Sequence, residues 1–398
     1  MFINQILYGL KHLHKPQLKF LTVLFQTILV CQSRINFSSL ARHSSLNERT
    51  FRRQFRQTLD FTEINQAIMT QSECQITAFA MDASFIRKSG KETFGLDKFW
   101  NGCASRAEKG LEAAIISLVC AKQGASFALT VDQTAPNLSN KEADLEKKTR
   151  IDFYAAQVEQ VASQILKHTK VGLFDGYYAK LKFVTRMEQA KFTVISRLRS
   201  DANLKYLYEG EQKARGRHRK YEGKIDFKDV RRLAETTVKA ANKVVKLYAG
   251  AVWSVSLKRK INLVVVKYEK KTVNLFSTDL EMSASQIFWL YRSRFTIEFL
   301  IRDAKQSGGL SDCQARDNEA LEFHWNAALT AVNLARGMAH QEELNQGIKQ
   351  PFSMKTIKQQ FFNEHLVNLF ICKLGFEQSL IKCKETLTEL RNYATSFS

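Results

Sequence analysis

The sequence contains few residues that break a chain. Of its 398 residues only 3 are Pro and 17 are Gly, and 44% are hydrophobic. A chain of this length and composition can bury two or three domains with real cores. The composition therefore argues against disorder as the global state.

The cysteines offer no clear framework for disulfides or for a structural metal. There are 7, an odd number, and no two of them form a C-x-x-C pair. This usage argues against a zinc site and favours reduced, mostly buried thiols. We therefore predict a cytoplasmic protein.

A long hydrophobic run is also missing. The longest apolar run near the start, residues 20–31, has twelve residues with an internal Gln, and it follows Lys11, Lys15 and Lys19. A spanning helix needs about 20 apolar residues. A signal peptide shows the same order of charges, but no small-residue cleavage site follows, so we interpret the run as a core helix. No membrane partner is expected.

Acidic residues are scarce relative to basic ones. Lys and Arg total 60 against 39 Asp and Glu, which gives a net charge of +21. The first-choice partner of such a chain is a polyanion, nucleic acid before membrane. Between Arg197 and Lys271 there are 21 basic and 8 acidic residues, which is +13 of the total. We expect this segment to be the strongest surface for a nucleic-acid backbone.

Residues 1–75 are predicted to be helical because they lack runs of alternating β-branched residues. Within them, residues 38–57 have the layout of a helix-turn-helix. A short helix would precede a turn at Ser44 and Ser45, and Asn47 is a plausible N-cap for the second helix.

The second helix of this pair carries both apolar and basic side chains. Phe51 and Phe55, four residues apart, would anchor it to the core. Its arginines would then point toward a DNA groove: Arg49, Arg52, Arg53 and Arg56. The alternative is an ordinary basic amphipathic helix packed on the body. We favour the DNA-reading alternative because four arginines are dense for a merely solvated face.

From residue 76 the apolar pattern indicates strands. Short apolar runs with small or β-branched residues predict strands at 75–86, 110–121, 125–136 and 191–198. A helix is predicted at 140–168, and residues 170–180 read as a buried strand that turns into a helix. This order predicts an α/β fold with a mixed sheet.

Residues 199–275 interrupt that pattern. Residues 213–224 form a loop-like basic cluster, and residues 244–280 alternate apolar and basic positions in the manner of strands. We therefore predict a β-rich insertion. Aromatic residues, Trp253 among them, lie between its Lys and Arg, a mixture suited to phosphates and exposed bases. An equally good alternative is that the aromatic side chains pack within the sheet and that only the basic side chains are solvated.

Residues 288–306 read as one helix without Pro or Gly, yet they carry polar side chains at intervals of three, four and seven: Tyr291, Arg294, Glu298 and Lys305. At ~100° per residue these four fall within a stripe roughly 60° wide. Apolar residues of the same segment border this stripe, which is unusual for a face exposed to solvent. The stripe therefore needs a functional explanation.

Three acidic residues stand out by position. Asp82 lies in the first predicted strand, Asp175 at the end of a later strand, and Glu298 on the helix after the insertion. Phosphodiester chemistry with two metal ions needs such a set, because Mg²⁺ prefers carboxylate oxygens and the ions lie about 3.5–4 Å apart. A single Asp at a strand end is more often a turn residue. The joint pattern is much stronger evidence.

The motif Y-x2-R-x3-E-x6-K, formed by the four stripe residues, resembles the signature of the DDE transposases of the insertion sequence four family of bacterial insertion sequences. "AMDASF" around Asp82 and "LFDGYYAK" around Asp175 look like the regions that hold the first two catalytic aspartates of that family. The resemblance spans roughly residues 35–340. It implies a ribonuclease-H-like catalytic core with a β-rich insertion before the glutamate helix.

The resemblance also implies a division of the chain into five regions. These are a helical DNA-binding domain with a helix-turn-helix (1–75), the first part of the catalytic core (76–198), the basic β-rich insertion (199–275), the last strand and glutamate helix of the core (276–310), and a helical C-terminal region (311–398). By analogy, the last region would mediate dimerisation.

By resemblance, Asp82, Asp175 and Glu298 would hold two Mg²⁺ ions, for which Mn²⁺ would substitute. The remaining stripe residues would contact phosphates at the cut end: Tyr291, Arg294 and Lys305. This role would explain the polar stripe, with the rest of the helix packed. Lys305 has an alternative role as a cation at a helix end, favoured by the dipole.

Further DNA contacts are suggested by two segments. Residues 308–317 resemble the polar loop that follows the glutamate helix in the family, so Gln314 and Arg316 are candidate contacts. Some relatives flip a base against a Trp in the insertion, and Trp253 is the only Trp of that segment here. Its position is not matched to theirs.

The resulting hypothesis is a cut-and-paste transposase that binds terminal inverted repeats, exposes a 3′-OH with water, and joins it to target DNA. It would act at least as a homodimer in the synaptic complex, on nucleoid DNA in a bacterial cytoplasm. A transposase-derived DNA-binding protein and a metal-dependent nuclease without strand transfer remain alternatives. The three acids argue against the first and the signature Tyr, Arg and Lys against the second.

Overall fold

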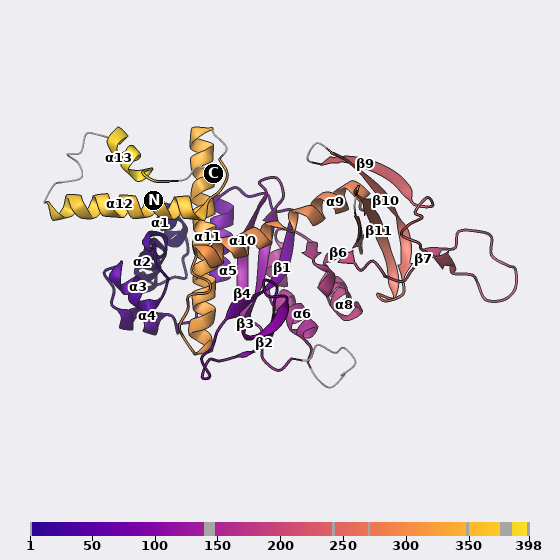
Figure 1. Ribbon diagram of the computed structural model, residues 1–398, viewed down its shortest axis with the longest axis horizontal. Helices are drawn as coiled ribbons and strands as arrows, with labels where there is room; N and C mark the ends of the chain where they lie inside the picture. Colours follow the sequence, from indigo (N-terminus) through magenta and orange to yellow (C-terminus); the bar gives the residue numbers. More distant parts are fainter. Residues whose placement is uncertain are drawn as a thin grey trace.

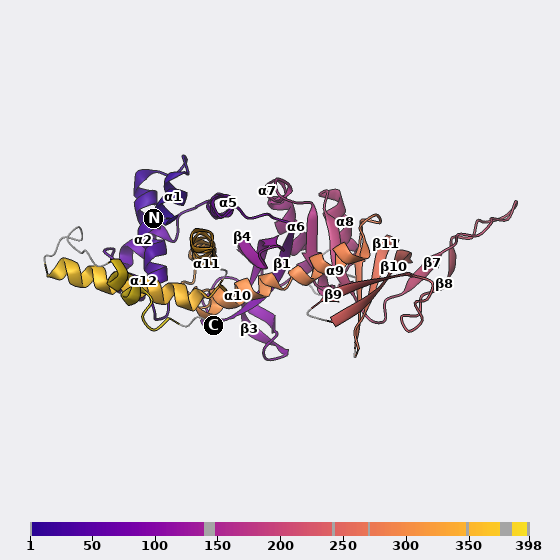
Figure 2. The same ribbon diagram turned by 90° about the horizontal axis from the view of Figure 1, so that it is seen from above.

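The computed structural model describes residues 2–138, 148–240, 243–269, 271–347, 350–374 and 384–395. Helices form both ends of the chain and a large mixed sheet lies between them (Figure 1). The molecule is elongated, with helix α12 (Met354–Lys373) extending from one end and strands β7 (Leu204–Leu207) and β8 (Tyr221–Lys224) at the other (Figure 2). The predicted α/β class with helical terminal regions is confirmed.

The N-terminal region contains helices α1 (Phe2–Tyr8), α2 (Lys15–Val30), α3 (Phe37–Arg42), α4 (Glu48–Gln54) and α5 (Phe61–Gln71). The predicted short helix pair is α3 and α4. The Asn47 side chain accepts a hydrogen bond from the Thr50 backbone N–H at 2.9 Å and so caps α4. Phe51 and Phe55 are buried, as predicted, and the Phe55 ring lies 4.6 Å from that of Phe323.

The first half of the sheet contains β1 (Ala78–Arg87), β2 (Asp97–Asn101), β3 (Arg106–Cys120), β4 (Ala125–Gln133), β5 (Val171–Phe174) and β6 (Thr193–Leu198). Strand β1 runs antiparallel to β3 and parallel to β5, where Phe79 lies opposite Gly172. Strands β5 and β6 are also parallel. The predicted strands and the mixed sheet are therefore confirmed.

Helices cover both faces of this half of the sheet. Helices α5, α10 (Thr296–Gln306) and α11 (Asn318–Gln346) share one core with Ala78 and Ala80 of β1. Helices α6 (Arg150–Gln160), α7 (Ala162–Leu166) and α8 (Leu181–Gln189) share the other with Phe79 and Met81. This alternation follows from the two-residue period of a strand. The predicted helix 140–168 corresponds to α6 and α7 from Arg150 onward, and its residues 140–147 lie outside the described residues.

The predicted insertion is rich in strands but does not form a separate layer. Besides β7 and β8 it contains β9 (Ala234–Ala240), β10 (Lys243–Ser254), β11 (Arg259–Lys267) and β12 (Thr272–Ser277). Strand β12 pairs antiparallel with β6, so the sheet continues in the order β6–β12–β11–β10–β7–β8, with β9 on β10. In the segment 276–310, where the last strand of the core was expected, only Phe276 and Ser277 belong to a strand, and they are the end of β12. Pairing covers an edge of β6 that would otherwise be open.

The single helix predicted at 288–306 was wrong. The segment forms α9 (Ala284–Ser293) and α10, interrupted at Arg294 and Phe295. The Ser293 hydroxyl donates to the Leu290 carbonyl, and the Thr296 hydroxyl donates to the Ser293 carbonyl, each at 2.7 Å. Side-chain bonds of this kind compete with the backbone ladder of a helix, which accounts for the interruption. The two helices nevertheless follow one path across the sheet (Figure 1).

The C-terminal region consists of α11, α12 and α13 (Lys384–Arg391) within the described residues. Helix α11 packs on β4 and α5, whereas α12 contacts α2 and extends away from the sheet in both views (Figures 1 and 2). Several of the apolar side chains of α12 and its C-cap are exposed: Leu366, Leu369, Phe370 and Leu374. None of the helices in the described part of the chain is long and apolar enough to cross a bilayer.

Candidate active site and DNA-binding surfaces

Asp82 lies on β1, on the face that also carries Ala78 and Ala80 and that packs against α10. Its Oδ1 accepts a hydrogen bond from the Ala83 backbone N–H at 2.9 Å. Burial raises the pKa of Asp82 to about 7, the Asp175 and Glu298 carboxylates add to the rise, and Arg294 opposes it. The carboxyl group is therefore buried among charges of both signs.

Asp175 directly follows β5, the parallel neighbour of β1, so both aspartates lie toward the same edge of the sheet. Its Oδ1 accepts a hydrogen bond from the Tyr177 backbone N–H at 2.9 Å and caps a short 3₁₀ turn, Gly176–Tyr178. Burial raises the pKa of Asp175, and the turn amides and Arg294 counteract the rise. Asp175 thus has both the turn role and the position near Asp82 that the sequence suggested.

Glu298 lies in the first turn of α10, and Arg294 holds it. The Arg294 guanidinium donates to Glu298 Oε1 at 2.7 Å, and the Arg294 side chain is 8% exposed whereas that of Glu298 is 44% exposed. Burial would lower the pKa of Arg294, but Tyr291, Asp82 and Glu298 together raise it. Arg294 is therefore a buried positive charge shared by all three candidate catalytic acids.

The structure brings the three predicted acids within electrostatic range of one another. No group of three His, Cys, Asp or Glu side chains in the described segments lies close enough to hold a metal ion, and Glu298 is engaged by Arg294. The donor chemistry nevertheless fits a hard divalent cation, because all three groups are carboxylates.

The remaining residues of the polar stripe also face this region. Burial raises the pKa of Tyr291, whose charged neighbours include Asp175 and Arg197. The Lys305 ammonium donates to the Phe85 carbonyl of β1 at 2.7 Å, and burial lowers its pKa. Lys305 therefore ties α10 to the strand that carries Asp82, a contact that sequence reasoning missed.

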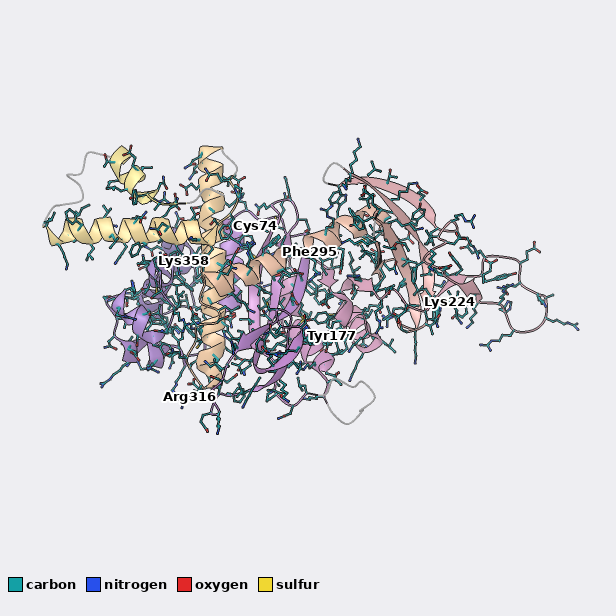
Figure 3. All side chains as sticks on the ribbon, in the orientation of Figure 1. Cys74, Tyr177, Lys224, Phe295, Arg316 and Lys358 are labelled. Atoms are coloured by element: carbon teal, nitrogen blue, oxygen red, sulfur yellow. The ribbon has the colours of Figure 1, made fainter. Side chains whose placement is uncertain are left out.

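The expectation that the rest of this helix is packed was wrong. Trp289, Phe295 and Phe299 are 44%, 48% and 49% exposed. Figure 3 shows Phe295 near the junction of α9 and α10. Guanidinium groups cover part of these rings, with Arg302 lying 5.1 Å from the Phe299 centroid. The aromatics are exposed because the two helices contact the sheet along one side only.

A cavity of about 790 Å³ opens beside Asp175, Tyr291 and Arg294. Its lining includes basic residues that sequence reasoning did not assign to the site: Arg197, Arg199, Lys271 and Arg292. One signal could have found two of them. Arg197 and Arg199 lie at the carboxyl end of β6, next to the carboxyl end of β5 where Asp175 follows, and the carboxyl ends of parallel strands meet at one edge.

A second groove, of about 700 Å³, lies between α4 and the loop before α11. It brings together every arginine predicted on the second short helix and both candidates of the polar loop: Arg49, Arg52, Arg53, Arg56, Gln314 and Arg316. All six are exposed. Arg52 donates to Glu48 at 2.9 Å and Arg56 to Asp317 at 3.3 Å, so acidic residues fix part of the cluster. Figure 3 shows Arg316 near the start of α11.

Trp253 is not brought to the candidate catalytic acids. It lies on β10, and its ring packs on Tyr221 of β8 with the centroids 5.5 Å apart. It does not line the cavity beside Asp175. The sequence had left its position open, and the structure places it at the far end of the sheet.

Comparisons with known proteins point to a transposase domain, and a solved transposase structure is among the similar chains. Residues 146–334 match the family model described as "Transposase DDE domain", a segment that includes Asp175 and Glu298. Among solved structures, the chain is similar to a piggyBac transposase in a cryo-EM synaptic complex with hairpin DNA, with 10% identity, a TM-score of 0.40, and coverage of 93% of this chain and 75% of that one. No curated protein sequence matches significantly. The family match supports a transposase of the DDE type.

Proposed function

We propose that this protein is a cut-and-paste DDE transposase of the insertion sequence four family. It binds the terminal inverted repeats of its element, cleaves phosphodiester bonds and joins the 3′-OH ends to target DNA. The observation that carries the proposal is the convergence of Asp82, Asp175 and Glu298 around one buried arginine, Arg294. Two of these acids lie in the segment that matches the transposase DDE domain.

The three acids would hold two Mg²⁺ ions, or Mn²⁺ in their place. Bound there, the ions would activate water or a 3′-OH as nucleophile and stabilise the leaving oxygen. Arg294 balances the buried negative charge of the carboxylates when Glu298 pairs with it. Lys305 fixes α10, and with it Glu298, against β1 through the Phe85 carbonyl.

A ribonuclease-H-like core is supported by the central strand order β4–β3–β1–β5–β6. Asp82 and Asp175 lie on or directly after neighbouring parallel strands, and Glu298 comes from a helix that packs on β1. Such an arrangement fixes three carboxylates on independent rigid elements. Rigid support of this kind is what a phosphoryl-transfer site needs to keep its ligands in place.

The cut DNA end would lie against the polar stripe and the cavity beside Asp175. Tyr291, Arg294 and Lys305 would contact its phosphates. The cavity contributes further positive charge from Arg197 and Arg292, which suits a polyanion near the acids.

End recognition would use the groove between α4 and the loop before α11. Arg49, Arg52 and Arg53 lie on α4, whereas Arg56 follows its end, so the second helix is shorter than the sequence predicted. These four arginines and Arg316 are exposed together, and Gln314 adds a side chain that can read base edges. The short helix pair α3 and α4 has the layout of a DNA-reading helix-turn-helix. This groove would position the terminal inverted repeat.

Synapsis would require a homodimer. Leu366, Leu369 and Phe370 recur on α12 at intervals of three and four residues, and Leu374 follows at its end, all exposed. A projecting helix with such an apolar stripe suits packing on a second copy of the chain. The dimer would act on nucleoid DNA in the bacterial cytoplasm.

The test uses purified protein and a duplex that carries the DNA flanking its own gene, with wild type compared with Glu298→Gln and Mg²⁺ compared with EDTA. Strand products are mapped at nucleotide resolution. We expect metal-dependent cuts at matching inverted ends that vanish in the variant. Tight binding without cleavage in Mg²⁺ or Mn²⁺ would favour the DNA-binding derivative, and cuts at arbitrary positions would favour a nuclease without strand transfer.

A further inference from the structure

A narrow arm projects from the end of the sheet opposite the helical regions. Residues 208–220 connect β7 to β8 and extend beyond the sheet in both ribbon views (Figures 1 and 2). Lys224, labelled in Figure 3, lies at the base of this arm. Every residue from 209 to 220 is exposed, so the arm packs on nothing in the described part of the chain.

The stem of the arm is nevertheless ordered by its own contacts. The Gln212 side chain donates to the Arg219 carbonyl and accepts from the Arg219 N–H, each at 2.8 Å. The Arg219 guanidinium lies 4.8 Å from the Tyr208 ring centroid, and the Tyr208 N–H donates to the Lys220 carbonyl at 3.1 Å. These contacts close a stem and leave residues 213–218 as a tip.

The tip concentrates positive charge that has no acidic partner in the described part of the chain. It contains Lys213, Arg215 and Arg217, and no acidic residue occurs between Lys213 and Tyr221. None of these three side chains forms an ion pair or hydrogen bond with a residue that the structure describes. By contrast, the nearby Arg231 and Arg232 pair with Asp229 and Glu222. The tip arginines are therefore available to a ligand.

Gly216 separates the two tip arginines and has a φ of +103°. A side chain at this position would meet no atom within 4 Å, so the absence of a side chain serves backbone conformation and not internal packing. The result is a thin turn whose backbone can approach a surface closely, with an arginine on each side.

We propose that this arm inserts Arg215 and Arg217 into the minor groove of A·T-rich duplex DNA. This inference deepens the proposed function, because it assumes that the chain acts on DNA. The minor groove is about 6 Å wide, too narrow for a helix but open to a thin arm. A·T-rich tracts narrow it further and strengthen its negative potential, which attracts arginine. The tip has no large apolar side chain that would favour a membrane.

The base of the arm adds to this surface. Trp253 packs on Tyr221, and the Lys205 ammonium lies 5.2 Å from the Tyr221 ring centroid. These groups would contact the sugar-phosphate backbone beside the groove. The arm lies at the far end of the sheet from Asp82 and Asp175, so it would grip DNA away from the bond that is cleaved (Figure 1).

The test measures binding of the full-length protein in EDTA to labelled duplexes of equal length, one A·T-rich and one G·C-rich, by fluorescence anisotropy. Wild type should bind the A·T-rich duplex at least about five-fold more tightly, the scale of one specific base-edge contact. Netropsin, which occupies the A·T minor groove, should abolish that preference. Equal affinity for the two duplexes would overturn the proposal.

Substitutions separate groove insertion from simple charge attraction. The double variant Arg215→Lys and Arg217→Lys keeps the charge but loses the planar guanidinium groups. The ratio of its affinities for the A·T-rich and the G·C-rich duplex should therefore fall toward one. The matched control, Arg231→Lys with Arg232→Lys, changes two exposed arginines outside the tip and should retain the wild-type preference. An undiminished preference in the tip variant would contradict groove insertion.

Two further outcomes keep this proposal distinct from the proposed function. Glu298→Gln should keep the A·T preference although it does not cleave, so a failure of cleavage leaves this result intact. Tighter binding to a duplex RNA than to either DNA would overturn the proposal, because the RNA minor groove is wide and shallow. If no duplex binds at all, both proposals fail.

Discussion

Asp82→Asn should stabilise the metal-free protein while it abolishes cleavage. The pKa of Asp82 is raised from 3.8 to about 7, mainly by burial. Because the folded state holds this proton more tightly than the unfolded chain does, folding is favoured at low pH, and this advantage is lost progressively as pH rises from 3.8 to about 7. Ionising Asp82 in the folded protein therefore costs about 4 kcal/mol relative to the unfolded chain, an upper bound for its full effect at pH 8.

The assay is urea denaturation in EDTA at pH 5 and pH 8. Asp82→Asn should raise the free energy of unfolding by up to about 4 kcal/mol at pH 8 and by about 2 kcal/mol at pH 5, where less of the cost is realised. Divalent metal should stabilise wild type and not the variant, because binding to the folded state alone adds stability. A variant that is less stable than wild type at pH 8 would refute the reasoning.

Asp132→Asn provides a matched control. Asp132 lies on β4, and burial with the nearby Glu322 raises its pKa to about 6. It is not one of the three candidate catalytic acids. The control should also stabilise the metal-free protein at pH 8, but it should retain the metal response.

Four further predictions concern Arg294 and three residues outside the candidate active site. Arg294→Met should destabilise the protein by about 1–3 kcal/mol in urea denaturation, because it removes the positive charge beside the buried carboxyl groups of Asp82 and Asp175, whereas a loss of activity with unchanged stability would contradict this role. Asn47→Ala should cost about 1 kcal/mol and Asn47→Ser much less, since the α4 cap is retained in the second variant. Arg53→Ala should weaken binding to the terminal inverted repeat and reduce by about one the slope of the logarithm of the binding constant against the logarithm of the salt concentration. An unchanged slope would show that Arg53 does not contact the DNA. Phe370→Lys should shift a dimer toward monomer in sedimentation velocity, with no effect expected if α12 lies outside the interface.

Local patterns predicted the parts of the fold that local physics decides. The small and β-branched runs specified β1, β3 and β4, and Asn47 with Phe51 specified the start and the buried side of α4. The approach of Asp82 to Asp175 followed from their places on or at the end of strands. The strands and the helix cap depend on residues close in the chain, whereas the approach of the two aspartates also depends on the parallel pairing of β1 with β5.

Features that depend on distant pairings could not be predicted in the same way. The pairing of β12 with β6, which merges the expected insertion with the core sheet, depends on a register that no local pattern reveals. The interruption between α9 and α10 at Arg294 depends on the Ser293 and Thr296 hydroxyl groups, which bond to backbone carbonyls and not to solvent. The exposure of Phe299 depends on which side of α10 the sheet covers.

The single continuous sheet has a mechanical consequence. Hydrogen-bonded strands run without interruption from β1 and β5 through β12, β11 and β10 to β7 and β8. A paired sheet resists stretching across its strands, because lengthening it breaks many backbone hydrogen bonds at once. The far edge is therefore held at a constant distance from the carboxylates. A DNA duplex that binds at both places would have to span that fixed distance between its two points of contact.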